Sequence, residues 1–542
     1  MAEPKENLQM EKIVSLCKRR GFVFQSSEIY GGLNGFWDYG PLGAELKRNV
    51  KELWWHAMTR QRDDVAGLEA TIIMSPKIWE ASGHVATFSD PMIDCKTCKG
   101  RFRADQTDEI PCPQKPSKCV NECHGEKTEA RAFNLMFQTY VGPTATAADI
   151  AYLRPETAQA IFAQFKNVLE TSRQKVPFGI AQVGKAFRNE VTPRNFTFRS
   201  REFEQMELEF FIKPDEVIEA IHGSVAKVSE SGHPGEPQSN WGWQAWHQYW
   251  VEERVRFYEG IGLSRETLGF HNQTPAELAH YARACTDILF KFPFSKKDAD
   301  GNVAGDELEG IAARSDFDLS QHQRFSGKPM GVFDDELRAA WAKLPKEKQD
   351  DLWKRYYDHR KNYLTKSAKP DETPEQISQQ ATNDANGLAK GQYIPHVIEP
   401  SAGVDRLILA LIANAYSEVT ETDDKGKSET RVTMKFHPRV APIKVAVLPL
   451  MKNKPEIVQK AEAVRALLRP WMNVFYDEAG SIGRRYARQD EAGTPFCVTI
   501  DFDTLGEKPE LLDTVTIRYR DDGRQERLKI SELLAFLLSK IR

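Results

Sequence analysis

Hydrophobic residues recur at two different spacings along this chain, and each spacing predicts a different element. Residues 8–21, which close on a glycine, and residues 44–60 carry apolar side chains at helical intervals. Residues 68–74 predict a strand, and residues 178–184 and 202–211 predict two strands with one polar face each, because they are short, turn-bounded and partly alternating. The first 440 or so residues are therefore expected to form an α+β region with an antiparallel hairpin.

The pattern changes after Pro442, where short strands and helices alternate. We expect strands at 443–448, 473–476, 496–500 and 514–519, and helices at 457–468, 482–491 and 531–538. Alternation of this length predicts an α/β domain of about 100 residues with a mixed sheet. A chain of 542 residues is expected to hold two or three domains, and this is the clearest separate one.

Three stretches interrupt these patterns. Residues 229–260 are rich in tryptophan and tyrosine, which predicts an insert containing a helix with an aromatic packing face. Residues 334–390 are rich in charged residues and glutamine at helical spacing, which predicts a second, helical insert. Residues 418–429 are charged and contain glycine, which is typical of a hairpin loop or linker.

Composition excludes several classes of protein. The chain is 40% hydrophobic and 28% charged, with a net charge of −4, which is typical of a globular protein and not of one that coats DNA. It lacks an apolar run of about eighteen residues, so a membrane span is not expected. Residues 1–6 do not have the order of a secretory signal. We expect a cytoplasmic enzyme.

Five of the eight cysteines fall between Cys95 and Cys123, which favours a local metal site in a reducing compartment over a disulfide scaffold. Cys95 and Cys98 have zinc-knuckle spacing, and Cys119 and Cys123 can complete a site of four thiolates. Cys112 and His124 are competing ligands, and free thiols are the alternative. Four soft ligands leave no open position, so a zinc ion here would be structural.

Arginines and carboxylates are concentrated in residues 184–207 and 399–406. The loop between the two predicted strands holds four arginines, at 188, 194, 199 and 201, which suits a hairpin that reaches over a polyanion. Arginine holds carboxylate and phosphate with its planar fork, and fixed cations stabilise charge that develops at phosphorus. Any one of these arginines alone would more simply be an exposed strand end paired with Glu190 or Glu202.

Together these two segments resemble motifs 2 and 3 of the class II aminoacyl-tRNA synthetases. Their sequences are similar to those of the homodimeric type of glycyl-tRNA synthetase. The glycine-rich turn and helix that follow residue 35 resemble motif 1, which in that family forms a homodimer interface; an ordinary surface helix is the alternative. The resemblance covers residues 8–212, 270–330 and 391–542. It implies a class II catalytic domain over residues 1–437, built on an antiparallel sheet, and an anticodon-binding domain over residues 438–542. It places motif 1 at about 35–74, the possible zinc-binding insert at 93–127, motif 2 at 184–210 and motif 3 at 399–413.

The resemblance also implies roles for particular residues. Arg188 would bridge the amino-acid carboxylate and the α-phosphate, and Arg406 would pack on adenine and reach the γ-phosphate; both are the expected catalytic residues. The implied ATP-binding residues are Arg188, Asn189, Glu190, Phe198, Arg199, Ser200, Arg201, Glu202, Phe203, Glu307, Leu308, Gly403, Val404, Asp405 and Arg406. The implied glycine-binding residues are Arg103, Glu156, Phe203, Glu204, Gln205, Met206, Glu207, Arg314, Glu399, Ser401 and Gly403.

The expected reaction is that of a glycine–tRNA ligase. ATP and glycine would give glycyl-adenylate and pyrophosphate, with Mg²⁺ neutralising phosphate charge, and glycine would then pass to the 3′ end of tRNA(Gly). Three glutamates would bind the ammonium group, and Arg314 would fill the space that a larger side chain needs. Two alternatives remain at this point: another class II synthetase with the same anticodon domain, and an accessory subunit that has lost activation chemistry. The basic segment at 480–490 is of a type that binds RNA phosphates; an ordinary solvated helix is the alternative.

Overall fold

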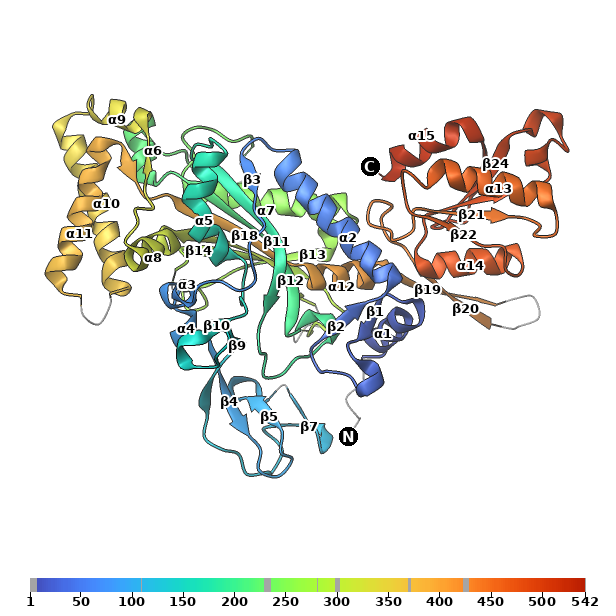
Figure 1. The fold of residues 1–542 in the computed structure, drawn as a ribbon, viewed down its shortest axis with the longest axis horizontal. Coiled ribbons are helices and arrows are strands. Elements are labelled where there is room, and N and C mark those ends of the chain that lie inside the picture. The colour runs from blue at the N-terminus through green and yellow to red at the C-terminus, as the bar shows by residue number, and fades with distance from the viewer. Residues whose placement is uncertain are drawn as a thin grey trace.

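The centre of the chain is a seven-stranded sheet in which all neighbours but one are antiparallel (Figure 1). The computed structural model describes residues 7–108, 110–228, 235–279, 281–297, 303–368, 372–422 and 428–541. In spatial order the strands are β13 (Leu268–Asn272), β14 (Ala284–Phe290), β15 (Asp306–Ser315), β18 (His396–Gly403), β12 (Glu202–Ile212), β11 (Phe178–Phe187) and β3 (Val65–Gly67). The predicted α+β class is confirmed, and the two predicted hairpin strands are present as β11 and β12.

The register of this sheet brings distant segments of the sequence together. Glu207 of β12 stands opposite Ser401 of β18, and Glu399 of β18 stands opposite Ala312 of β15. Because successive strand residues face opposite sides of a sheet, Phe210 packs into the core on one side and Phe211 into the core on the other. The sheet therefore has two buried faces, and polar groups must find partners within it.

The strand predicted at residues 68–74 is wrong. The chain pairs with β11 only over β3 and then leaves the ladder. Side chains replace the missing strand partner: the Ala70 N–H donates to the Gln182 side-chain oxygen at 3.0 Å, and the Arg154 guanidinium donates to the carbonyl oxygens of Ala70 and Thr71 at 3.1 and 3.3 Å. A buried arginine thus satisfies backbone groups that the sequence pattern assigns to a ladder.

Helices cover both faces of the sheet. One core includes residues of α1 (Leu8–Arg20), α2 (Pro41–Trp55), α7 (Trp243–Gly260) and α12 (Val404–Ala415). The other includes residues of α5 (Ala158–Thr171), α6 (Asp215–His222), α8 (Phe317–Ser326), α9 (Asp335–Trp341), α10 (Lys346–Lys366) and α11 (Pro374–Gly387). A π-helical turn, His56–Arg60, extends α2 to the predicted end of its helix. Short elements complete the region: β1 (Val23–Gln25), β2 (Trp37–Tyr39), α3 (Pro76–Ala81), α4 (His84–Thr87), β9 (Gln138–Tyr140), β10 (Ile150–Tyr152), β16 (Val332–Phe333) and β17 (Gln392–Tyr393).

The inserts fold largely as their patterns indicate. The aromatic face of α7 packs in the core through Trp246 and Trp250, although residues 229–234 of the predicted insert lie outside the described residues. The charged insert forms α9, α10 and α11, and its residues 369–371 also lie outside the description. The hairpin prediction near residue 420 is confirmed by β19 (Tyr416–Thr422) and β20 (Ser428–Met434), with residues 423–427 not described.

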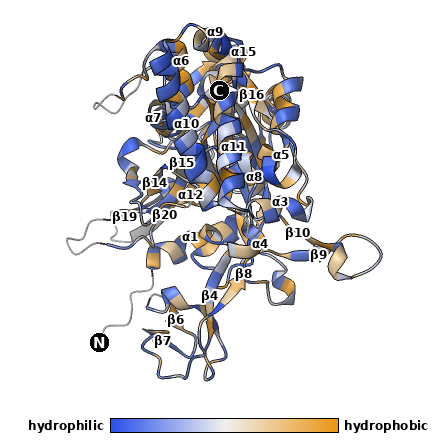
Figure 2. Cartoon of the chain, turned by 90° about the vertical axis from the view of Figure 1, so that its left-hand side faces the viewer, coloured by the Kyte–Doolittle hydropathy of each residue, from blue (hydrophilic) through white to orange (hydrophobic). Residues whose placement is uncertain are grey.

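A small three-stranded sheet projects from the main body, as Figures 1 and 2 show from two directions. It consists of β4 (Ser89–Asp94), β5 (Arg101–Arg103) and β8 (Arg131–Asn134), and it adjoins the short hairpin of β6 (Pro111–Cys112) and β7 (Lys115–Cys119). All five clustered cysteines lie on or between these strands, so the chain concentrates them in one small unit with its own apolar cluster around Ile93 and Phe102.

The C-terminal region forms a separate mixed sheet with its own core, on the right of Figure 1. In spatial order its strands are β22 (Val474–Tyr476), β21 (Val445–Pro449), β23 (Phe496–Ile500), β24 (Thr514–Tyr519) and β25 (Gln525–Lys529). Its helices are α13 (Pro455–Leu468), α14 (Ile482–Ala492) and α15 (Ile530–Ile541). Sequence patterns predict every one of these elements except β25. In the described ranges, no helix combines the length and the apolar character that a membrane span requires.

Candidate active site

A cavity of about 430 Å³ opens over the antiparallel sheet, where β12, β15 and β18 meet the loop between β11 and β12. Most of the residues singled out from the sequence line it. They are Glu156, Arg188, Glu190, Phe198, Arg199, Ser200, Phe203, Gln205, Glu207, Glu307, Leu308, Glu399, Ser401, Gly403, Asp405 and Arg406. Three segments far apart in the sequence thus converge on one hollow.

Strand alternation decides which residues of β12 reach the cavity. Phe203, Gln205 and Glu207 line it, whereas Glu204 and Met206 point to the opposite face. Met206 is fully buried in the core and Glu204 forms an ion pair with Lys47 at 2.8 Å. The sequence interpretation included both side chains in the glycine site; the structure does not place either of them there.

Five more predicted residues also have other partners, and their side chains do not line this cavity. Val404 is buried in the core, and Glu202 forms an ion pair with Lys185. Asn189 donates its N–H to the Leu135 carbonyl at 2.7 Å. Arg201 donates to the carbonyl oxygens of Glu190 and Asn34 at 3.1 and 2.9 Å, and Arg103 of β5 pairs with Asp90 and Asp105 at 2.9 and 2.7 Å. Arg201 and Asn189 brace the arginine-rich loop and do not face a ligand.

Two arginines stand against aromatic rings in the cavity. Arg188 donates from Nε to the Pro155 carbonyl at 3.0 Å, and its guanidinium carbon lies 5.4 Å from the centre of the Phe203 ring. The guanidinium carbon of Arg406 lies 4.5 Å from the centre of the Phe198 ring, and its Nη1 lies 3.3 Å from a carboxylate oxygen of Glu307. Each guanidinium uses only some of its N–H groups in these contacts, so the remaining N–H groups can bind a ligand.

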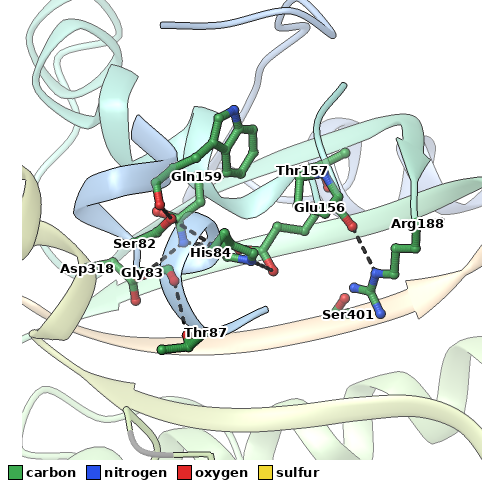
Figure 3. A network of polar contacts seen from close by, with 12 residues as sticks. Ser82, Gly83, His84, Thr87, Glu156, Thr157, Gln159, Arg188, Asp318 and Ser401 are labelled. Atoms are coloured by element: carbon green, nitrogen blue, oxygen red, sulfur yellow. Dashed lines mark hydrogen bonds and ion pairs between the residues drawn. The ribbon is translucent and has the colours of Figure 1, made fainter. Parts of the chain in front are cut away.

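The other part of the cavity is acidic. Glu207 accepts hydrogen bonds from the Thr157 N–H at 3.1 Å and from the Ser401 hydroxyl at 2.9 Å. Glu156 accepts from Gln159 at 3.0 Å and faces His84 Nε2 at 3.3 Å, as Figure 3 shows. With Glu399, three carboxylates line one small volume. Sequence reasoning nominates these three glutamates, and the structure brings them together.

Arg314 lies behind this acidic group. Its Nη1 donates to Glu399 at 2.6 Å, and its Nε and Nη2 donate to the two oxygens of Asp318 at 2.9 and 3.1 Å. The guanidinium is 3% exposed and stacks 4.0 Å from the centre of the Tyr281 ring. Burial opposes the charge of Arg314, but Asp318 and Glu399 raise its pKa well above the usual value. Arg314 is therefore a fixed buried cation beneath the cavity, not part of the lining.

The three glutamates differ in charge. Burial raises the pKa of Glu399 to about 8, helped by Glu207 and Glu156 and opposed by Arg314. Burial and Glu156 also raise the pKa of Glu207. Burial acts the same way on Glu156, but His84 and Arg314 outweigh it and lower the pKa of that carboxyl. An incoming cation therefore meets Glu156, which is firmly ionised, and two carboxyl groups whose ionised form it stabilises.

Sequence reasoning missed several residues of this site. Gln273, Tyr281 and Asp287 line the cavity, and Gln273 donates to both carboxylate oxygens of Asp287 at 3.1 and 3.0 Å. No motif marks them, because they come from β13, β14 and their connection. Glu209 is also missed. It follows Glu207 by two residues, so strand alternation was the signal that places both on one face.

The cysteine cluster contains a contact between thiols that spacing does not predict. Cys112 Sγ lies 3.4 Å from Cys123 Sγ, and the Cys98 N–H points to Cys95 Sγ at 3.5 Å. Burial, with Cys95 and Cys112 as neighbours, raises the pKa of Cys98, so Cys112 stands near the first pair as well. A Cβ added at Gly125 would lie 2.7 Å from Cys95 Sγ, which shows how closely the backbone wraps this thiol. Cys112, a competing ligand in the sequence, therefore contacts Cys123, which spacing pairs with Cys119.

Comparison with known proteins agrees with this geometry. Residues 145–231 match the family described as "tRNA synthetase class II core domain (G, H, P, S and T)", and residues 444–540 match the "Anticodon binding domain". With the antiparallel sheet and its arginine-lined cavity, these matches define a class II aminoacyl-tRNA synthetase. The chain is 42% identical to the glycine–tRNA ligase of Treponema denticola over 99% of this chain and 98% of that one. It is 42% identical to the same enzyme of Thermobifida fusca, over 98% of both chains, and 41% identical to that of Thermus thermophilus, over 98% of this chain and 99% of that one. The chain belongs to the glycine–tRNA ligase family.

Proposed function

We propose that this chain carries out the glycine–tRNA ligase reaction in the cavity described above, with glycine in the acidic part and ATP against the two arginines. The observation that carries this assignment is the division of one cavity into a cationic, aromatic part and a part with three carboxylates. An ammonium group fits the carboxylates, and a triphosphate fits the arginines.

In the activation step, the glycine carboxylate attacks the α-phosphorus of ATP and pyrophosphate leaves. Arg188 holds the attacking carboxylate and the α-phosphate together and stabilises the negative charge that builds on the phosphate oxygens. Its contact with the Pro155 carbonyl fixes the direction of the guanidinium. Arg406 and Phe198 hold the nucleotide from the other side, with Arg199 towards the γ-phosphate.

Glycine selection follows from charge and bulk. Glu156, Glu207 and Glu399 bind the ammonium group, and Arg314 holds Glu399 in place from behind. Because Arg314 is buried and tied to Asp318 and Glu399, and the half-buried Tyr281 stacks against it, the wall cannot retreat to admit a larger side chain. Glycine has no smaller competitor, so steric exclusion alone is sufficient and no editing site is needed.

Magnesium is expected with ATP, and the residues present suit it. Glu307 and Asp287 offer carboxylate oxygens in the same cavity, which are the ligands that Mg²⁺ prefers. When bound, the ion neutralises charge on the leaving pyrophosphate. The cysteine unit suits a structural zinc ion, which we assign to Cys95, Cys98, Cys112 and Cys123.

We further infer a homodimer that works in the cytoplasm. The segment just before the region resembling motif 1 leaves apolar side chains uncovered: Ile29 and Tyr30 are 88% and 87% exposed. The eight cysteines are all free thiols in the structure, as a reducing compartment requires. The measurement of molar mass by light scattering tests the dimer.

The experiment that tests the function is ATP–pyrophosphate exchange with each of the twenty amino acids, with Mg²⁺ and without tRNA. Exchange with glycine alone supports the assignment of both halves of the cavity. Exchange with another amino acid would still support a class II synthetase, but it would refute the assignment of the acidic part of the cavity to glycine. Absence of exchange with any amino acid would favour the accessory-subunit alternative.

A further inference from the structure

Glu209 is a buried acid that the proposed reaction does not use. Its side chain is 0% exposed, and neither carboxyl oxygen has a hydrogen-bond partner among the described residues. One oxygen each from Glu207, Glu209 and Glu399 lie within 4.8 Å of one another. An ionised carboxylate without donors at this depth is strongly disfavoured, so its state of protonation needs a physical explanation.

The charges around Glu209 do not balance. The groups that face it are Glu207 on its own strand, Glu399 on β18, Arg314 on β15 and Asp318 on α8. Arg314 is the cation of this set, and it is shared between Asp318 and Glu399. Glu156 and Tyr281 complete the surroundings of Arg314 and Glu399. Four carboxyl groups against one guanidinium cannot all ionise in a buried space, so at least one must hold a proton.

Hydrogen bonds indicate which of these four carboxyl groups holds a proton. Glu207 accepts from Thr157 and Ser401, and Glu399 accepts from Arg314. Asp318 accepts two bonds from the same guanidinium and one from Gln159 at 2.9 Å. Each of these bonds favours the ionised form of its acceptor, and Glu209 receives none. Burial, with Glu399 as neighbour, accordingly raises the pKa of Glu209 well above its usual value.

We propose that Glu209 is a positioning residue that remains protonated at neutral pH, so that Glu207 and Glu399 are the carboxyl groups of this set that carry negative charge when glycine is bound. This inference rests on the proposed function for the place of the glycine ammonium, which contacts Glu207 and Glu399 and not Glu209. Glu209 fills the space beneath them without adding repulsion. Glu399 is then the group whose proton the ammonium displaces, so glycine binding strengthens as pH rises toward about 8.

The test is the pH profile of kcat/KM for glycine in pyrophosphate exchange, measured with wild type and Glu209→Gln. Glutamine copies the shape and neutrality of a protonated acid. We expect the midpoint of the acidic limb to stay where it is in wild type. If Glu209 were ionised, its removal would relieve repulsion, and the midpoint would move to lower pH by about one unit or more. Such a shift overturns the proposal. Glu207→Gln is the contrast, because it removes a ligand and should raise the KM for glycine.

Infrared difference spectroscopy tests the protonation itself, without reference to substrate. Wild type minus Glu209→Gln, at neutral pH, should show the carbonyl band of a protonated carboxylic acid; a carboxylate band in its place overturns the proposal. Glu209→Met is a second variant of similar volume. The wild type minus Glu209→Met difference should show the same carbonyl band, and a carboxylate band in its place would again overturn the proposal. Failure of glycine exchange would overturn the proposed function and leave the infrared result standing.

Discussion

Lys47 lies 2.8 Å from Asp405, the residue that precedes Arg406 in the chain, and this ion pair joins α2 to the start of α12. The same ammonium lies 2.8 Å from Glu204 of β12. Asp405 also accepts from the Tyr39 hydroxyl at 2.6 Å and from the Glu204 N–H at 2.7 Å. A helix from the region resembling motif 1 therefore fixes both the strand that carries Phe203 and the turn that presents Arg406.

Lys47→Met should lower the free energy of unfolding by about 3–5 kcal/mol, because it leaves the largely buried Asp405 without this cation and Glu204 with Lys51 alone. Pyrophosphate exchange should fall even under conditions in which the variant is folded, because Arg406 loses its support. Denaturant unfolding and exchange kinetics measure the two effects. Lys51→Met is the matched control: Lys51 also pairs with Glu204 but its side chain is 30% exposed, so the loss should be about 1 kcal/mol or less. Equal losses in both variants would contradict the role given to Lys47.

Arg188→Ala should reduce pyrophosphate exchange by roughly a hundredfold to a thousandfold, the loss typical of a donor aimed at developing charge. The fold should be unaffected, because Arg188 makes one hydrogen bond to a carbonyl and no described ion pair. Circular dichroism and exchange kinetics check this. Lys185→Ala is the control and should remain active, because Lys185 is exposed on β11, three residues before Arg188, and pairs with Glu202. Activation close to the wild-type rate in Arg188→Ala would refute its assignment.

Sequence reasoning succeeds here where a local pattern is tied to local geometry. The hairpin strands and almost every C-terminal element follow from periodicity, and the cavity arginines follow from motifs. It fails where a side chain acts across the fold. Arg154 replaces a strand partner for residues 70 and 71, and no local sequence pattern predicts this contact. Asp287 and Tyr281 reach the site only through sheet register, and Met206 leaves it because strand alternation turns its side chain to the core.

The basic residues of α14 differ in burial, and we expect them to differ in function. Arg485 is buried and donates to the carbonyl oxygens of Pro449 and Leu450 at 2.5 and 3.2 Å, whereas the side chain of Arg484 is exposed. Arg484→Ala should leave pyrophosphate exchange intact and weaken tRNA charging, with a smaller dependence on salt, because a phosphate contact is lost. Arg485→Ala should instead lower the stability of the C-terminal domain, which thermal unfolding measures. Unchanged charging by Arg484→Ala would exclude this face of α14 from RNA binding.

Replacing Cys112 should remove the metal, and replacing Cys119 should not. The contact between Cys112 and Cys123 brings these two thiols together, whereas no such contact is described for Cys119. We expect about one zinc per chain in wild type and Cys119→Ser, and little in Cys112→Ser, as measured by plasma emission spectroscopy on purified protein. Chelation should loosen the small sheet of β4, β5 and β8 in hydrogen exchange and leave the main sheet protected. The opposite pattern for the two serine variants would restore the ligand set given by spacing.

The charged helical insert is anchored by a buried ion pair. Arg360 of α10 binds Asp316, at the end of β15, and Asp384 of α11 at 2.8 Å; Arg360 and Asp316 are each 1% exposed. Burial disfavours the charge of Asp316, but Arg360 and His359 outweigh it and hold its pKa below the usual value. A carboxyl with a lowered pKa stabilises the fold at neutral pH, and that stabilisation is lost as pH falls below about 4 and the group takes a proton.

Asp316→Asn should therefore cost about 1–3 kcal/mol at pH 7, less than the loss of a whole pair because Asp384 still binds Arg360. The difference from wild type should shrink in acid, because the unfolded wild-type chain takes up a proton at this carboxyl before the folded protein does. Urea unfolding at pH 7 and near pH 3 measures both quantities. Asp335→Asn is the control, because Asp335 pairs with Arg338 at the surface and its loss should be small at either pH. A deficit in Asp316→Asn that does not depend on pH would mean that packing, not charge, holds the insert to the catalytic domain.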